Sequence, residues 1–115
     1  MNTVQLLGRL TAEPQVRYTQ GENPQAIANF TLAVDRQFGK ETDFIRCVAF
    51  GKRAEALDNF CKKGTKIAVV GSIQTGSYEK DGVKHYTTDV IVNSFDFCEK
   101  KEETANESNE EIPFN

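Results

Sequence analysis

The sequence predicts an all-β fold, a small closed barrel of five strands with a single helix between the third and the fourth. Several segments alternate apolar and polar residues, which is the two-residue period of a half-buried strand. One segment alone has apolar residues at the spacings of three and four that a helix needs. With 115 residues, 38% of them hydrophobic and 27% charged, the chain can bury one small core.

Three strands are predicted in the first half of the chain. Apolar residues alternate along residues 4–10 and along 26–34, so each segment is expected to bury one side. Proline, glycine and asparagine within residues 14–24 mark a loop between them. The charged stretch 35–42 marks a second loop, and a third strand is expected over 43–50.

The predicted helix follows the third strand. Its apolar residues at helical spacing are Ala54, Leu57, Phe60 and Cys61. Gly64 is the expected stop, because glycine readily takes the conformation that follows a helix end. Lys62 and Lys63 then lie near the C-terminus of the helix, where the helix dipole favours positive charge.

The last two strands are predicted to form a long hairpin. Asp81-Gly82 is a strong signal for a two-residue hairpin turn. With that pair at the turn, Glu79 faces Lys84 and Tyr78 faces His85. The first pair has opposite charges and the second is aromatic, so both should stabilise the hairpin.

The last strand is expected to run to Phe97 with a shift of its apolar phase near Asn93-Ser94, which predicts a β-bulge. Three strands, one helix and two further strands make the order of the oligonucleotide/oligosaccharide-binding barrel, the OB-fold. Residues 1–98 are predicted to form this domain, and residues 99–115 an acidic flexible tail.

Charge is unevenly divided between these two parts. Residues 1–98 carry 12 Lys and Arg against 11 Asp and Glu, a net charge of +1, whereas residues 99–115 carry 2 against 6, a net charge of −4. A body with its cations on one face can therefore still bind an anionic polymer. The tail ends in an apolar tip that has nothing nearby to pack against, so we expect it to bind another protein.

The predicted third strand contains the clearest functional signal. Phe44, Arg46 and Phe50 point to one side of it, and the small uncharged side chains of Cys47 and Ala49 point to the other. A barrel core does not tolerate an unpaired arginine, so the side with the two rings is expected to face water. Rings beside a cation suit single-stranded nucleic acid, because bases stack on aromatic faces and phosphates attract positive charge.

Two further rings join this predicted platform, Phe38 in the second loop and Tyr78 near the hairpin tip. Alternatively, Phe38 and Tyr78 fold back into the core, or Phe44 and Phe50 pack against a neighbouring subunit. The cations expected to contact phosphates are Arg17, Arg36, Lys40, Arg46, Lys52, Arg53, Lys80 and Lys84. Core or interface packing is expected for Phe30, Phe60, Phe95 and Phe97, and Tyr18 fits either role.

The chain resembles the bacterial-type single-stranded DNA-binding proteins, whether cellular, phage or plasmid encoded. The matching stretches are residues 2–10, 14–19, 30–34, 43–52, 63–64, 71–75 and 112–114. The resemblance implies base stacking on Phe38, Phe44, Phe50 and Tyr78, and a homotetramer around which the strand wraps. It also implies that the tip recruits replication, recombination and repair proteins through Glu110, Glu111, Ile112, Pro113 and Phe114.

The chain differs from the family in having no tryptophan, a short tail, and Asn115 after the phenylalanine on which the family normally ends. Two other functions remain open at this point: an RNA-binding OB-fold chaperone and a protein-binding OB scaffold. An enzyme is not expected, since His85 is the only histidine and Gly51-Lys52 lacks the rest of a phosphate-binding loop.

No cofactor or metal is expected either. Cys47, Cys61 and Cys98 show no metal-site spacing, and apolar neighbours favour reduced core thiols of a cytoplasmic protein. No apolar run approaches the roughly 20 residues that cross a bilayer, so neither a membrane partner nor export is expected.

Overall fold

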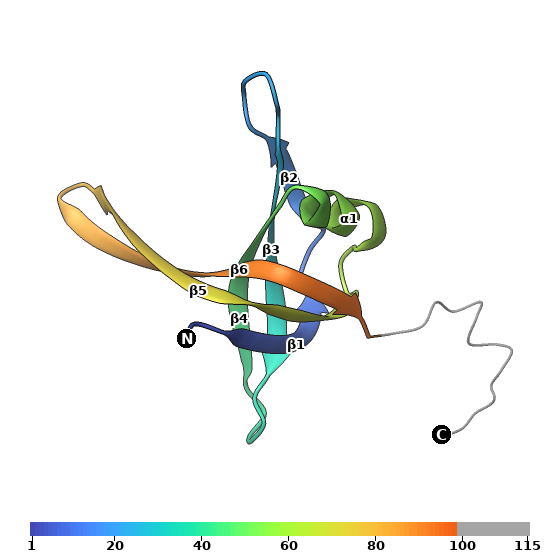
Figure 1. The fold of residues 1–115 in the computed structure, drawn as a ribbon. Coiled ribbons are helices and arrows are strands. Elements are labelled where there is room, and N and C mark those ends of the chain that lie inside the picture. The colour runs from blue at the N-terminus through green and yellow to red at the C-terminus, as the bar shows by residue number, and fades with distance from the viewer. Residues whose placement is uncertain (99–115) are drawn as a thin grey trace, which may run out of the picture.

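The computed structural model describes residues 1–98, which form six strands and one helix (Figure 1). In chain order these are β1 Val4–Leu10, β2 Gln15–Tyr18, β3 Ala26–Asp35, β4 Thr42–Phe50, α1 Lys52–Phe60, β5 Lys66–Lys80 and β6 Val83–Phe97. The predicted tail, residues 99–115, lies outside the described residues.

The strands close into a barrel in the order β1-β3-β4-β6-β5, with β1 also pairing β5. All pairs are antiparallel except the short parallel pair of β4 with β6. Three strands precede the helix in this ring and two follow it, as the sequence predicted. The OB-fold prediction is confirmed.

The core follows from strand alternation. Residues of one phase point into the barrel, where the largest fully buried side chains are Leu10, Leu32, Leu57, Ile67, Val69 and Cys47. The helix α1 packs against β2, β3 and β4 and contributes Ala54 and Leu57 to this cluster. The opposite phase of each strand is left on the outer surface, where a ligand can reach it.

The β5–β6 hairpin projects beyond the barrel (Figure 1). Asp81 and Gly82 have φ values of 55° and 78°, as a two-residue hairpin turn requires, and glycine takes such values without steric cost. Tyr78 pairs with His85 and Glu79 with Lys84, as predicted. The rings of Tyr78 and His85 stack with centroids 5.0 Å apart and planes inclined by 18°.

The predicted bulge is confirmed at Asn93. Val70 pairs with Ser94 and Gly71 with Val92, so Asn93 is the extra residue of β6. The bulge shifts the alternation by one residue, which lets Phe95 and Phe97 pair with the inward-facing Val69 and Ile67.

Other details of the prediction were wrong. The loop expected within residues 14–24 contains the short strand β2, which pairs with β3 from Gln15↔Asn29 to Tyr18↔Ala26. The helix ends at Phe60 and not at Gly64, because Cys61 already has an extended conformation. Lys62 and Lys63 therefore lie in the loop that follows the helix, where Thr65 donates its backbone N–H to the Lys62 carbonyl.

Three side chains expected in apolar surroundings lie at the surface. Cys98 is an exposed thiol, whereas Cys47 and Cys61 are buried as predicted. Phe60 and Phe97 are exposed and contact each other edge to face, with centroids 6.5 Å apart. Core packing was thus wrong for these two rings, and the interface alternative remains for them. Phe30 lies in the core and Phe95 packs partly against it.

Candidate nucleic-acid interface

The outward side of β4 carries Phe44, Arg46 and Phe50. Their neighbours in sequence, Cys47 and Ala49, are fully buried, which fixes the direction of the alternation. Phe44 is 67% exposed and Phe50 38%, so each ring offers a face to solvent. The platform predicted from the sequence therefore lies on the outside of the barrel, and packing of these two rings against a neighbouring subunit stays the alternative.

The neighbouring strand β3 keeps these rings uncovered. Ala33 lies beside Phe44 and Thr31 beside Arg46 in the antiparallel register. A methyl group and a hydroxyl are too short to cover a phenyl ring or a guanidinium. The row on β4 thus stands above the surface of β3.

This outward side continues from β4 into the β5–β6 hairpin. Val48 is in register with Ile91 of β6, and the next outward residues, Arg46 and Asp89, form an ion pair with Nε and Oδ1 3.4 Å apart. His85 lies four residues before Asp89 on β6, so the two side chains share one side of the strand, and His85 stacks on Tyr78. The Tyr78 ring, 53% exposed, therefore belongs to the same side of the sheet as Arg46.

We call this continuous surface the ring face: the outward side of β3 and β4 with the same-facing side of the β5–β6 hairpin. Phe38 lies in the β3–β4 loop, which borders the ring face at the Phe44 end, and it is 83% exposed. All four rings expected to stack on bases are thus accessible to solvent. Tyr18 is exposed but has the phase of the inward-facing Val16, so it does not belong to the ring face.

Six of the eight predicted phosphate-contacting cations lie on or beside the ring face. Arg17 of β2 is in register with Ile27, which in turn lies beside Phe50. Lys80 has the same phase as Tyr78 at the hairpin tip. The remaining four of the six are Arg46 on β4, Lys40 in the β3–β4 loop with Phe38, and Lys52 and Arg53 at the start of α1, which Gly51 separates from Phe50.

The other two predicted cations have a different setting. Arg36 bridges Glu41 and Asp43 at 2.7 and 3.1 Å, so it closes the base of the β3–β4 loop. The hydrogen bond to Asp43, together with its negative charge, raises the pKa of Arg36. Lys84 lies on the opposite side of the hairpin from Tyr78, with its Nζ 5.6 Å from the centre of the Tyr86 ring.

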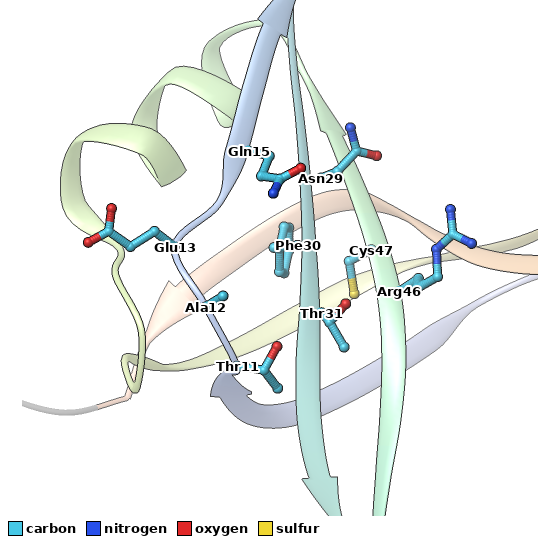
Figure 2. Close-up of a pocket in the computed structure, with 9 residues that line it drawn as sticks. All are labelled: Thr11, Ala12, Glu13, Gln15, Asn29, Phe30, Thr31, Arg46 and Cys47. Carbon is cyan, nitrogen blue, oxygen red and sulfur yellow. The ribbon is translucent and has the colours of Figure 1, made fainter.

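A pocket of about 460 Å³ opens next to Arg46 (Figure 2). Its walls come from the β1–β2 connection, β2, β3 and β4, and it is lined by Thr11, Ala12, Glu13, Gln15, Asn29, Phe30, Thr31, Arg46 and Cys47. Burial raises the pKa of the Cys47 thiol to about 12, with a smaller contribution from the charge of Asp89. At neutral pH this thiol is therefore uncharged and a poor nucleophile.

Comparison with known proteins assigns the chain to a family. The Single-strand binding protein family matches residues 1–98. The chain is 54% identical over 101 residues to a single-stranded DNA-binding protein of Clostridium perfringens, covering 86% of this chain and 67% of that protein. It is 47% identical over 114 residues to single-stranded DNA-binding protein 1 of Streptococcus pyogenes, covering 94% and 86%. The chain belongs to the single-strand binding protein family.

As a member of the single-strand binding family, the chain has a β-barrel surface of exposed rings and cations where the sequence analysis expected a nucleic-acid interface. The polar pocket residues Gln15, Asn29 and Thr31 were not predicted from the sequence. For Asn29 and Thr31 the sequence did hold a signal. They alternate with the buried apolar residues of β3, so their side chains must point outward.

Among residues 1–98, the helix α1 has nine residues, which is too short to span a bilayer. Within the same residues, no group of three or more His, Cys, Asp or Glu side chains is placed to hold a metal ion.

Proposed function

We propose that this protein binds single-stranded DNA without sequence specificity along the ring face. The observation that carries the proposal is the continuity of that face, which joins Phe44, Phe50 and Tyr78 from strands far apart in the sequence. The names of the relatives, all single-stranded DNA-binding proteins, support the same substrate.

The proposed mechanism is stacking combined with charge. Unpaired bases lie against the rings of Phe38, Phe44, Phe50 and Tyr78, and any base can do so because every base has a flat π-face. Phosphates between them contact Arg17, Lys40, Arg46, Lys52, Arg53 and Lys80. A strand held in this way cannot form hairpins and is shielded from nucleases. No bond is made or broken, so the role is that of a binder and not of a catalyst.

The wider role in the cell follows from the same proposal. We infer that the protein acts in the cytoplasm during replication, recombination and repair, assembles as a homotetramer, and recruits partner proteins through residues 110–114. The acidic charge of residues 99–115 supports a weak competition between the tail and DNA for the cations of the ring face.

Alanine substitution on the ring face tests the proposal. Phe44→Ala and Phe50→Ala should each weaken binding of an oligo-dT by about 1 to 3 kcal/mol, because each removes a stacking surface. Phe60→Ala is the matched control, since Phe60 is a ring at the end of α1, outside the ring face, and its exposure is close to that of Phe44. A labelled oligonucleotide must report binding, because the chain has no tryptophan.

Unchanged affinity in both Phe44→Ala and Phe50→Ala would sink the proposal, as would an equal loss in Phe60→Ala. Comparing oligo-dT with oligo-rU separates DNA from RNA binding, since an RNA-binding barrel uses the same stacking physics but contacts the 2′-hydroxyl. Absence of binding to either oligonucleotide at low salt would favour a protein-binding scaffold.

A further inference from the structure

The pocket beside Arg46 results from a change of partner along β3. The C-terminal half of β3 pairs with β1 at Ala33 and Leu32, and its N-terminal half pairs with β2 from Asn29 onward. Between them the connection from β1 to β2 runs beside the same edge of β3, held by the backbone N–H of Thr11, which donates to the Thr31 carbonyl at 3.0 Å. No strand residue fills the gap at this point, and the hollow remains.

The walls of this hollow present polar side chains that have no partner in the protein. Within residues 1–98, the side chains of Gln15, Asn29, Thr11 and Thr31 form no hydrogen bond to another protein group. An amide or a hydroxyl can both donate and accept a hydrogen bond. These groups are therefore available to a ligand whose edge carries donors and acceptors side by side.

The floor of the hollow is apolar and its charge is low. Phe30 and Cys47, both buried, form the floor. Arg46 is the single cation among the lining residues. Asp89 offsets part of its charge, and its side chain, 65% exposed, remains accessible to a phosphate on the ring face. Figure 2 shows the Glu13 carboxylate turned away from the other labelled side chains. Neutral polar walls over an apolar floor suit a flat heterocycle better than a phosphate, which needs uncompensated positive charge.

The hollow opens onto the ring face. Thr31 is in register with Arg46, and Asn29 with Val48, so the polar wall lies beside the row that contains Phe44 and Phe50. A strand that follows this row must pass the mouth of the hollow. A base that is not stacked on a ring at that point can turn its edge inward.

We propose that this hollow, which we call the amide slot, receives one nucleobase of the bound strand by its hydrogen-bonding edge. The inference rests on the proposed function and adds a site to it: stacking holds bases of any identity, whereas the amide slot responds to the base at one position in each protomer. Gln15 and Asn29 read the edge, and the volume of about 460 Å³ is within the range of small-molecule sites.

Exchange of an amide for a carboxylate tests the slot. In Asn29→Asp a carboxylate, which only accepts hydrogen bonds, replaces an amide, which both accepts and donates them. A carboxylate accepts a hydrogen bond from the amino group of cytosine but opposes the O4 acceptor of thymine. Affinity should fall for both oligo-dC and oligo-dT of equal length because of the added negative charge. The ratio of their two Kd values should nevertheless shift toward oligo-dC by about three- to tenfold.

Gln74→Glu is the matched control. Gln74 is an exposed amide on β5 opposite Asp89, on the ring face but outside the slot. The same charge change there should weaken both oligonucleotides and leave their ratio unchanged. Gln15→Glu, at an exposed position on the other wall, should shift the ratio in the same direction as Asn29→Asp.

The outcomes separate the two proposals. If both oligonucleotides bind but neither Asn29→Asp nor Gln15→Glu shifts the ratio, the slot is wrong and the ring face stands. A shift of equal size in Gln74→Glu also overturns the slot, because the effect would then be one of charge alone. If the wild-type chain binds neither oligonucleotide, the proposed function fails together with the slot.

Discussion

Cys47 shows how the barrel interior changes the chemistry of a single side chain. Burial raises its pKa from 9.0 to about 12, and burial raises that of Cys61 to about 11. The folded chain therefore keeps both protons at a pH where the unfolded chain releases them. Stability should be intact below about pH 9 and should fall as the pH rises, by about 1.4 kcal/mol per pH unit for each thiol, up to about pH 11 for Cys61 and about pH 12 for Cys47.

Denaturant unfolding at a series of pH values from neutral to alkaline measures this slope. Cys47→Ala should reduce the slope, because Cys61 is then the remaining buried thiol that titrates. Cys98→Ala serves as the control, since it removes an exposed thiol from a surface that is solvated in both states. An unchanged slope in Cys47→Ala would show that burial of this thiol does not control the alkaline limit.

The alternation of side chains along a strand decides which residues could be predicted to be exposed from the sequence alone. The exposure of Phe44 and Phe50 was predictable because Arg46 lies between them and cannot be buried without a partner. The pairing of Arg36 with Glu41 and Asp43 was not, since a loop sequence does not show which side chains will turn toward each other. The roles of the ring-face residues in binding remain predictions.

Among the strands, β5 has the most demanding local geometry. A Cβ atom built on Gly71 would overlap the carbonyl oxygen of Ile91 in β6, next to the bulge at Asn93. We expect Gly71→Ala to lower the free energy of unfolding by about 1 to 3 kcal/mol, because the backbone has to move apart at the point where the barrel bends. Thermal or denaturant unfolding measures the loss.

Gly76→Ala on the same strand is the control for Gly71→Ala. There the nearest atom to a built Cβ is the side-chain Oγ1 of Thr87 at 3.1 Å, and a side chain can rotate away. Stability should change little in this variant. Equal losses at the two glycines would mean that the cost comes from strand propensity and not from the close approach at the bulge.

The long elements were predictable and the short ones were not. Apolar residues alternate along the whole of β3, so this strand and its place in the barrel followed from the sequence. The Asp81-Gly82 turn fixed the register of the β5–β6 hairpin in the same way. The four residues of β2 contain Val16 as their single inward-packed apolar side chain, which is too little for a periodic signal. Its pairing with β3 is a tertiary contact, and the pocket beside it was hidden for the same reason.

At the level of the whole chain, opposite charges are separated along the sequence. The cations of the ring face belong to residues 1–98, whose net charge is +1, and the tail carries −4. Phosphate contacts release counterions, so affinity for an oligonucleotide should fall as salt rises. The proposed competition of the tail for the same cations is electrostatic, so salt should screen it: the Debye length is roughly 10 Å at 0.1 M salt and 3 Å at 1 M.

Deletion of residues 110–115 should therefore have two separable effects. Capture of replication, recombination or repair proteins in a pull-down should be lost, because the apolar tip is gone. Affinity for oligo-dT should stay the same or rise slightly at low salt, and the difference should vanish at high salt as the charges are screened.

Two substitution variants that keep residues 1–115 divide these effects between the apolar and the acidic groups of the tip. Replacing Ile112 and Phe114 by alanine should abolish partner capture and leave DNA affinity unchanged, since no charge is altered. Replacing Glu110 and Glu111 by glutamine should strengthen DNA binding at low salt, because two anions that compete with phosphates are removed. Weaker DNA binding after the deletion would contradict the competition, and it would mean that the tip contributes to the interface instead of opposing it.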